Sequence, residues 1–253
     1  MEGKVALVVG ASSGIGRATA MAFAERGARV VAAARRQEEL DELVNDIQAL
    51  GVDAAAVQTD VSSAVEVRAM VDTTIARFGR LDYAVNNAGV EGVPAMFVDF
   101  DEEEWDRVVG INLRGNFLCL KYEAKAMLAA GHGGAIVNVG SVNSFLGFAG
   151  GAAYATSKHG QVALTSSASA ELAPQGIRVN IVCPGVIDTP MHQRLRGEFG
   201  DETYDGILNG SVHLRRSGQP EEIARTITFL CSDDASYLTG ATITPDGGYL
   251  TTM

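Results

Sequence analysis

Short apolar runs alternate with longer amphipathic segments along the chain. The apolar runs predict strands at 4–9, 29–34, 54–60, 82–87, 135–141, 177–184 and 241–247. Apolar positions at helical spacing predict helices at 15–27, 37–50, 63–78, 101–129, 152–173 and 220–231. Strands of this kind are typical of a sheet buried on both faces, and their alternation with helices indicates parallel strands. We therefore expect one α/β domain over residues 1–253, with helices on both faces of the sheet.

Residues 188–218 depart from this rhythm. They include five glycines, many charged side chains and only scattered apolar positions. A long segment after a strand end is often a lid or a substrate-binding element. The alternative is a surface excursion without a function of its own.

The amino-acid composition and the net charge limit the classes of protein to which this sequence can belong. The 253 residues are 47% hydrophobic and carry a net charge of −11. This charge argues against a nucleic-acid surface, because the dense basic spots are only the pairs at 35–36 and 215–216. No stretch is long and apolar enough for a membrane span, and the N-terminus lacks the pattern of a signal peptide. We expect a soluble, cytoplasmic protein without nucleic-acid or membrane partners.

The three cysteines, Cys119, Cys183 and Cys231, lie far apart in apolar runs. This pattern favours buried free thiols over disulfides or a metal site, and it fits a reducing compartment. The four histidines show no metal-ligand spacing, so we predict no metal centre.

A glycine-rich turn joins the first strand to the next helix. Its candidate cofactor-binding residues are Gly10, Ser12, Ser13, Gly14, Ile15 and Gly16. Glycines at such a turn let the backbone approach a pyrophosphate, and the helix N-terminus offers free N–H groups to it. The spacing G-x-x-x-G-x-G differs from the common dinucleotide fingerprint. We interpret the turn as a nucleotide site, and the alternative is a plain tight turn.

The end of the second strand predicts which dinucleotide binds. An acidic residue there would bind the ribose hydroxyls of NAD, whereas an arginine favours the 2′-phosphate of NADP. Arg35 and Arg36 occupy this end, and no carboxylate does. Guanidinium groups suit bidentate phosphate binding, so we predict NADP, with NAD the less favoured cofactor. The alternative is that both arginines are solvated charges at the start of the next helix.

Two further strand ends could border the cofactor. Asp60 and Val61 follow the third strand, where they could hydrogen-bond to the adenine and pack on it. Asn87, Ala88 and Gly89 follow the fourth strand and form a small turn. Either group could equally be an ordinary turn at a strand end.

Tyr154 and Lys158 are four residues apart on a predicted helix, so they share one face, with Cβ atoms about 5–6 Å apart. The ordinary pKa of tyrosine is about 10, and a neighbouring ammonium favours the phenolate. The spacing therefore indicates a pair that could do acid–base chemistry near neutral pH. By itself, the same spacing also occurs in ordinary surface helices.

Taken in order, these motifs resemble the short-chain dehydrogenase/reductase family over essentially the full chain. The matching pieces are GASSGIG at 10–16, Asp60-Val61, NNAG at 86–89, Asn112 in GINLRG, Ser141 in IVNVGS, Tyr154-x-x-x-Lys158, PGVIDT at 184–189 and DGG at 246–248. The resemblance implies a single Rossmann-type, doubly wound domain with a seven-stranded parallel sheet. It also implies a homotetramer, assembled chiefly through the helices at 101–129 and 152–173.

The same resemblance implies a catalytic tetrad of Asn112, Ser141, Tyr154 and Lys158. Tyr154 would be the general acid and base. Lys158 would lower the Tyr154 pKa and bind the nicotinamide ribose. Ser141 would stabilise the developing oxyanion, with Ser144 as the competing hydroxyl, and Asn112 would hold a water that relays protons to Lys158.

The resemblance also implies cofactor contacts at the far end of the site, from Pro184, Gly185, Ile187 and Thr189. One departure bears on the cofactor. Ser13 stands where some NADP-dependent members of the family have a basic residue. The prediction of NADP therefore rests on Arg35 and Arg36.

We predict an NADP-dependent oxidoreductase that acts on a ketone or secondary alcohol. The alternative within the family is a 3-oxoacyl-thioester reductase, which would need basic residues to grip an acidic carrier protein. Candidates for that role are Arg194, Arg196, Arg215 and Arg216. A remote alternative is a dinucleotide-binding sensor without turnover, which would need the glycine turn but not Tyr154.

Overall fold

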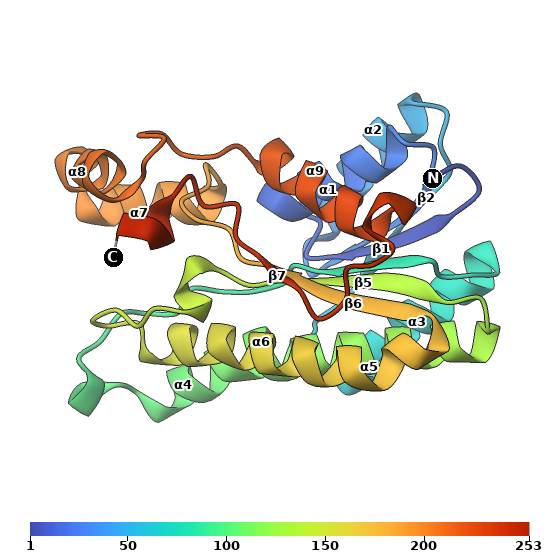
Figure 1. Cartoon of the computed structure of the whole chain (residues 1–253), viewed down its shortest axis with the longest axis horizontal. Coiled ribbons are helices and arrows are strands. Elements are labelled where there is room, and N and C mark those ends of the chain that lie inside the picture. The colour runs from blue at the N-terminus through green and yellow to red at the C-terminus, as the bar shows by residue number, and fades with distance from the viewer. Residues whose placement is uncertain (253) are drawn as a thin grey trace.

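The computed structural model describes residues 1–252, with the side chains at 198, 199, 203 and 252 left undescribed. Its centre is a seven-stranded parallel sheet in the order β3-β2-β1-β4-β5-β6-β7 (Figure 1). The strands are β1 Val5–Val9, β2 Arg29–Ala34, β3 Ala54–Gln58, β4 Tyr83–Asn86, β5 Gly134–Val139, β6 Ile177–Val182 and β7 Thr242–Ile243. The predicted fold class is confirmed, and only the last strand is much shorter than its predicted range of 241–247.

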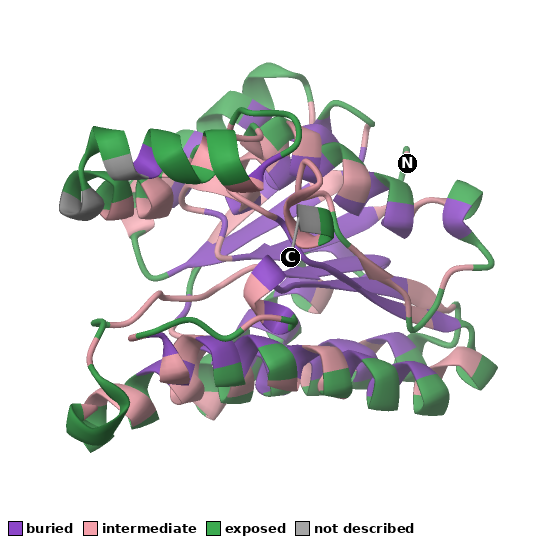
Figure 2. Ribbon diagram, turned by 60° about the vertical axis from the view of Figure 1, so that its left-hand side comes forward, coloured by how far each residue is buried: buried purple, intermediate pink, exposed green. Residues whose placement is uncertain are grey.

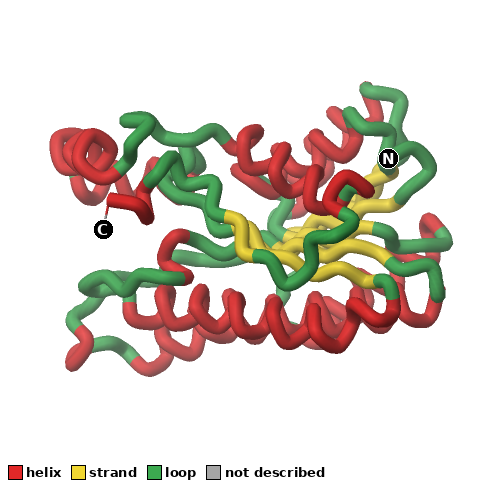
Figure 3. Tube along the Cα trace, in the orientation of Figure 1, coloured by secondary structure: helices red, strands yellow, loops and turns green. Residues whose placement is uncertain are grey.

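Helices cover both faces of the sheet, as the alternating pattern predicts (Figures 1 and 3). One face carries α1 Gly14–Ala24, α2 Gln37–Ala49 and α9 Pro220–Cys231. The other carries α3 Ala64–Phe78, α5 Asn116–Ala130 and α6 Ala152–Leu172. Short 3-10 turns lie at Phe97–Asp99, Val142–Ser144, Ala173–Gln175, Asp233–Ala235 and Tyr249–Thr252.

The core forms two layers, one on each side of the sheet. Successive residues of a strand point to opposite faces, so Ala6 and Val8 of β1 join one apolar cluster while Leu7 joins the other. Phe23 of α1 lies in the first cluster and Met70 of α3 in the second, both fully buried. Figure 2 shows the central strands buried between these layers, while β3 and β7 at the two edges of the sheet are only partly buried. The unbroken apolar runs in the sequence reflect this double cover.

The predicted helix 101–129 is interrupted in the structure. It consists of α4 Glu102–Val109, a π-helical segment Gly110–Gly115 and then α5. A π-helical segment inserts an extra residue per turn, and such segments are frequent at functional sites. The sequence pattern does not reveal this one, because its buried positions are Asn112 and Gly115, which carry no apolar signal.

The segment 188–218 contains two helices that the sequence analysis did not predict, α7 Pro190–Phe199 and α8 Asp201–Ser211. Among their described side chains, Tyr204 is buried and most others are exposed or half-exposed. A helix with so little buried surface has no clear apolar stripe, which explains why the sequence analysis missed both. Across the described residues, no helix has the length and apolarity that crossing a bilayer requires.

Candidate active site

The predicted site residues gather at the carboxyl edge of the sheet. The strand order places β1 next to β4, and at this point connections lead to opposite faces of the sheet. Ligands in doubly wound sheets bind outside the carboxyl ends of the strands at such a switch point. A cavity of about 390 Å³ opens there.

Thirteen of the predicted cofactor residues line this cavity. They are Gly10, Ser12, Ser13, Gly14, Ile15, Arg35, Arg36, Asp60, Val61, Asn87, Ala88, Gly89 and Thr189. Further lining residues include Val90, Glu91, Ile111 and Arg194. Both the glycine turn and the residues that follow β2, β3 and β4 therefore face one cleft.

The glycine turn allows close approach of the backbone. Gly10 has φ +82°, and a Cβ there would lie 2.6 Å from the backbone nitrogen of Ala88. A Cβ on Gly16 would lie 2.1 Å from the carbonyl oxygen of Gly10. The N-cap of α1, Ser13, makes no side-chain capping bond. The N-terminal N–H groups of α1 therefore have no side-chain acceptor, which suits an anionic group such as a pyrophosphate.

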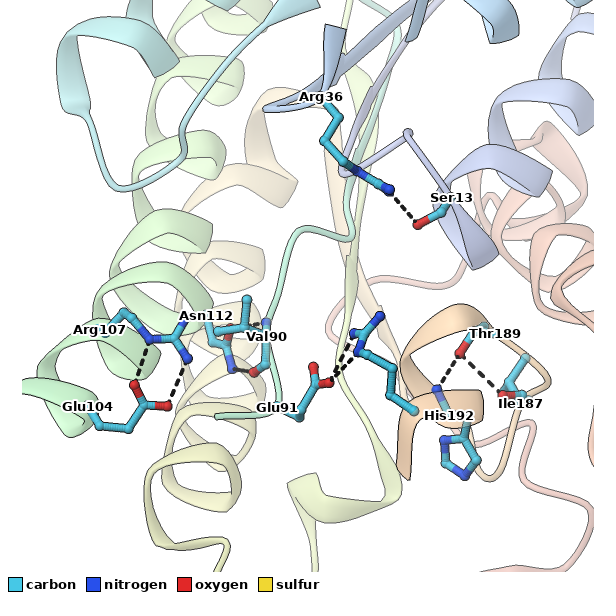
Figure 4. A network of polar contacts seen from close by, with 11 residues as sticks. Ser13, Arg36, Val90, Glu91, Glu104, Arg107, Asn112, Ile187, Thr189 and His192 are labelled. Carbon is cyan, nitrogen blue, oxygen red and sulfur yellow. Dashed lines mark hydrogen bonds and ion pairs between the residues drawn. The ribbon is translucent and has the colours of Figure 1, made fainter. Parts of the chain in front are cut away.

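Arg36 reaches from the end of β2 across the glycine turn (Figure 4). Its Nη2 donates to the hydroxyl oxygens of Ser12 and Ser13 over 2.9 and 3.0 Å. Its Nη1 lies 2.8 Å from Glu39 Oε1. Arg36 is therefore a cation at the border of the cavity, whereas Arg35 is exposed beside it.

Asp60 lines the cavity, yet its side chain closes a local turn. Its Oδ1 accepts hydrogen bonds from the backbone nitrogen and the hydroxyl of Ser62, over 2.9 and 2.8 Å. Asn87 likewise ties two turns together, because its side-chain nitrogen donates to the carbonyl oxygen of Gly10 over 3.0 Å. Both residues thus border the cavity and support its walls.

Tyr154 and Lys158 lie on α6, one turn apart as predicted. The Lys158 Nζ is 5.7 Å from the centroid of the Tyr154 ring. Nζ donates to the carbonyl oxygen of Val139 over 2.9 Å, and a Cβ on Gly89 would be 3.7 Å from it. The ammonium therefore lies beside the turn that follows β4, at the edge of the cofactor cavity.

Ser141, rather than Ser144, faces the tyrosine. A hydrogen bond joins the side chains of Ser141 and Tyr154. Ser144 is buried behind them, where its Oγ accepts from the Ser141 backbone nitrogen over 3.2 Å. The pair forms a reciprocal cap of the turn Val142–Ser144, which fixes the Ser141 side chain beside Tyr154.

The pKa of Tyr154 differs from the expectation. Burial raises it to about 12, and the hydrogen bond with Ser141 offsets this only in part. Burial also lowers the pKa of Lys158 to about 8. The expectation that Lys158 lowers the Tyr154 pKa is therefore not met, because withdrawal from water disfavours the charged form of both groups.

The side chain of Asn112 holds the loop after β4. Its Oδ1 accepts from the Val90 backbone nitrogen and its Nδ2 donates to the Val90 carbonyl oxygen, each over 2.8 Å (Figure 4). Its main-chain carbonyl points elsewhere and accepts a hydrogen bond from the side chain of Gln161 over 2.7 Å. Asn112 lies in the π-helical segment, whose altered bonding pattern accompanies this buried carbonyl bonded to a side chain.

The far wall of the site comes from the chain after β6. Thr189 caps α7 by accepting from the His192 backbone nitrogen (Figure 4). A Cβ on Gly14 would lie 3.1 Å from Thr189 Cγ2, so this cap lies against the glycine turn. Glu91 and Arg194 form an ion pair of 3.0 Å between the loop after β4 and α7.

Five predicted cofactor residues do not line the cavity, in addition to Gly16. They are Tyr154, Lys158, Pro184, Gly185 and Ile187, and of these the Lys158 Nζ lies close to Gly89, which does line the cavity. A Cβ on Gly185 would be 2.8 Å from the Cα of Asp246, and Ile187 is buried in a bridge to Gly218. These last three residues position the chain that carries Thr189.

Gln161 was not among the site residues predicted from the sequence. Its side chain is fully buried on α6 and contacts both Asn112 and Lys158. A polar residue one turn beyond Lys158 looks like a solvated helix position in the sequence. Its burial follows from the packing of α6 on the π-helical segment, which the sequence does not predict.

Known proteins resemble this chain over nearly its whole length. The family model described as "Enoyl-(Acyl carrier protein) reductase" matches residues 10–250. A 3-oxoacyl-[acyl-carrier-protein] reductase FabG of Thermotoga maritima is 40% identical, over 98% of each chain. Cyclohexanol dehydrogenase of an Acinetobacter species is also 40% identical, over 97% of this chain and 94% of that one.

Solved structures agree on the fold and differ in the bound nucleotide. Levodione reductase superposes with a TM-score of 0.95 at 36% identity, over the full length of both chains. An actinorhodin polyketide ketoreductase with NADPH has a TM-score of 0.92 at 37% identity, over 97% of each chain. An NAD⁺-bound xylitol dehydrogenase has a TM-score of 0.93 at 35% identity, over 98% and 99% of the two chains. The chain belongs to the short-chain dehydrogenase/reductase family of oxidoreductases, which bind a nicotinamide cofactor.

Proposed function

We propose that this protein is an NADP-dependent oxidoreductase that transfers hydride between the nicotinamide and a ketone or secondary alcohol. The observation that carries the proposal is Tyr154, hydrogen-bonded to Ser141 and one helical turn from Lys158, whose ammonium lies close to Gly89 in the cavity wall. The catalytic group, the orienting hydroxyl and the cation come from α6 and from the turn after β5. This is the arrangement that proton transfer to a carbonyl oxygen needs.

Support for NADP comes from the charge at the end of β2. Arg36 lies on the hydroxyls of Ser12 and Ser13, and Arg35 lies beside it. No acidic residue follows β2 directly, so a ribose 2′-hydroxyl lacks the usual acceptor there. A 2′-phosphate would instead meet two guanidinium groups, which bind it through charge-assisted hydrogen bonds.

Side chains of this protein would supply the proton that the reduction requires. When bound, the nicotinamide supplies or accepts the hydride. Because its pKa is raised to about 12, Tyr154 remains protonated at neutral pH and is prepared to donate to a carbonyl oxygen. Ser141 donates to the same developing oxyanion, and the Lys158 ammonium stabilises the tyrosinate that is left. A tyrosine that stays protonated at neutral pH can act as the acid when the reaction runs as a reduction.

The remaining site residues would position the two ligands. We infer that Pro184, Gly185, Ile187 and Thr189 hold the nicotinamide side of the cofactor, supported by the Thr189 cap against the glycine turn. Asn112 would hold a relay water on its main-chain carbonyl. Residues 188–218 would form the substrate-binding lid, supported by the contact of α7 with Glu91 across the cavity.

A 3-oxoacyl-thioester reductase is the second candidate, because the relative from Thermotoga maritima carries that name. Its expected carrier-protein contacts find less support. Arg194, Arg196 and Arg216 each form an ion pair with a carboxylate of this chain, Glu91, Asp201 and Glu222 respectively. Of the four candidate arginines, only Arg215 forms no ion pair among the described residues, and this limited unpaired positive charge favours a small free substrate.

Following the loss of NADPH or NADH absorbance tests both candidate functions directly. Purified protein would be mixed with NADPH or NADH and with a panel of cyclic ketones, linear ketones, aldehydes and acetoacetyl thioesters. We expect NADPH oxidation with small ketones and slower oxidation with NADH. Faster turnover of the thioesters would favour the second candidate, and equal use of NADH would contradict the role given to the two arginines.

We also propose that the protein is a cytoplasmic homotetramer. Exposed apolar side chains on α5, among them Phe117 and Leu128, support an interface on that helix. The three free, buried thiols support a reducing compartment. Light scattering on the purified protein tests the assembly, and a monomeric mass would contradict it.

A further inference from the structure

Gln161 links two members of the predicted tetrad directly. Its Nε2 donates to the main-chain carbonyl oxygen of Asn112 over 2.7 Å. Its Oε1 accepts from Lys158 Nζ over 3.4 Å. The side chain is 0% exposed, so no solvent competes for either contact.

The two partners fix the orientation of the amide. A carbonyl oxygen only accepts hydrogen bonds, and an ammonium only donates them. The Gln161 amide must therefore turn its nitrogen to Asn112 and its oxygen to Lys158, and a flipped amide would lose both bonds. A carboxylate lacks the donor and an apolar chain lacks both groups, so an amide of this length is suited to the position.

The same contacts determine where the Lys158 ammonium points. Of its three N–H donors, one goes to the Val139 carbonyl oxygen and one to Gln161. One remains for the side of the ammonium that faces Gly89 and the Tyr154 ring. The Thr165 hydroxyl donates to the main-chain carbonyl oxygen of Gln161 over 2.7 Å, so it does not compete for the side-chain amide.

We propose that Gln161 is a positioning residue, whose amide bridges the Lys158 ammonium to the Asn112 carbonyl and keeps the third N–H of Lys158 directed at Tyr154. This inference rests on the proposed function. The Asn112 carbonyl retains a second lone pair, so the bridge is compatible with the proposed relay water. The bridge stabilises the charged form of Lys158 against its burial, without itself being charged.

Few other titratable groups act on Lys158. Tyr154 shares its helix, and Cys183 faces it from the end of β6 as a thiol whose pKa is raised by burial. Glu91, in the loop after β4, faces Tyr154. From the other elements packed on α6, Arg114 of the π-helical segment bonds the Ser62 carbonyl, and Glu123 of α5 bonds Asn86. A change of the Lys158 pKa in a Gln161 variant should therefore reflect mainly the change at Gln161 and not the titration of another group.

The sequence makes a direct titration of Lys158 practical. The chain contains only four lysines, Lys4, Lys121, Lys125 and Lys158. Lys158 is 4% exposed, whereas the other three reach solvent. In NMR spectra of protein labelled with ¹³C at lysine Cε, the signal that titrates near its pKa of about 8 reports Lys158 without any cofactor or substrate.

Two variants of similar length should move this titration in opposite directions. Gln161→Met keeps the volume but removes the acceptor, so the Lys158 pKa should fall by about half a unit to one unit. Gln161→Glu places a carboxylate beside the ammonium and should raise it by about one unit. Gln175→Met, in the exposed turn after α6, is the matched control and should leave it unchanged.

Activity gives the second readout. Because protonated Lys158 is required, the alkaline limb of kcat/KM should move down in Gln161→Met and up in Gln161→Glu. If the Lys158 pKa does not change in the folded variants, or shifts in the same direction in Gln161→Met and Gln161→Glu, the proposed bridging role of Gln161 would be wrong. If the unmodified protein transfers no hydride, the proposed function fails, and the NMR titration still decides whether Gln161 acts on Lys158.

Discussion

Beneath α5 and α6 the protein buries a set of hydrogen-bonded polar side chains, whereas α7 and α8, across the cavity, are held by exposed ion pairs. In the buried set, Asn138 Nδ2 donates to Thr165 Oγ1, and Asn86 Nδ2 donates to both Asn138 and Glu123. Across the cavity, pairs such as Arg196–Asp201 have both side chains largely exposed. Polar side chains are paired in both regions, but one region is buried and the other is exposed to solvent.

The difference teaches which polar contacts matter for the chemistry. A polar contact in a buried place is strong when satisfied and costly when broken, because no water replaces the lost partner. An exposed ion pair contributes little, because water and salt screen it. The proposed catalytic groups lie on the buried side, where their geometry is fixed, and the proposed lid lies on the side that can adjust to a substrate.

The largest effect is expected on the buried side, at the acid itself. Tyr154→Phe removes the proton donor and keeps the ring, so kcat/KM should fall by a factor of about 10²–10⁴. Cofactor binding and the melting temperature should change little, because the ring packing remains. Steady-state kinetics, fluorescence titration with NADPH and thermal melting measure the three quantities. Activity within tenfold of the unmodified protein would contradict the assigned role.

The second effect is a change in the free energy of unfolding with pH. Burial raises the pKa of Glu123 to about 7, above its ordinary value of 4.5. The folded state therefore holds this proton more tightly, so the contribution of this carboxyl to the free energy of unfolding is fully present below about pH 4.5 and is lost as pH rises through 7, by up to about 3 kcal/mol. The Glu123 Oε1 and the Oδ1 atoms of Asn86 and Asn116 have no partner among the described residues. A proton on the carboxyl supplies a donor where acceptors gather.

Glu123→Gln should remove this slope and make the protein more stable than the unmodified one above pH 7. Urea unfolding at a series of pH values from 5 to 9 measures it. Glu171→Gln, on the exposed face of α6, is the control and should keep the slope. A Glu123→Gln protein with the original slope would show that another group causes it.

The third effect concerns Arg36, an exposed cation that would gain a further anionic partner from the 2′-phosphate of NADPH. Arg36→Ala should weaken NADPH binding by a factor of about 10–100, the range for a hydrogen bond to a charged group. NADH binding should remain nearly unchanged, because NADH lacks the 2′-phosphate. Isothermal titration with both nucleotides checks this, with Arg68→Ala on α3 as the exposed control. Equal loss for NADPH and NADH would indicate a structural role for Arg36.

The smallest effect is expected at the ion pair between α7 and the loop after β4. Arg194→Ala should change the free energy of unfolding by less than about 1 kcal/mol, because the Arg194 side chain is 59% exposed. KM for the substrate should change severalfold, with kcat nearly constant. A loss of stability above 2 kcal/mol would mean that this side is held as firmly as the buried one.

Most of the fold could be predicted from the sequence, because the strands appear in it as short, nearly continuous apolar runs. The runs at 29–34 and 37–50 match β2 and α2 within one residue. The segment 188–218 and the π-helical segment were missed for physical reasons. The helices α7 and α8 bury few side chains, and the buried positions of the π-helical segment, Asn112 and Gly115, are not apolar side chains.

The site could be predicted where a motif reflects a backbone requirement or a helical spacing. Gly10 and Gly16 stand where a Cβ would collide with backbone atoms, and Tyr154 and Lys158 share a helix face. Gln161 could not be predicted, because its burial depends on a neighbour 49 residues away. The pKa of Tyr154 depends likewise on burial, which spacing along a helix does not reveal.

The most direct test follows the hydride itself. NADPH carrying deuterium at the transferred position would be incubated with the protein and the best ketone of the panel, and the alcohol product would be examined by mass spectrometry and NMR. The account predicts one deuterium on the carbinol carbon with the unmodified protein, and little product with Tyr154→Phe. Product without deuterium, or equal product from Tyr154→Phe, would contradict hydride transfer assisted by this tyrosine.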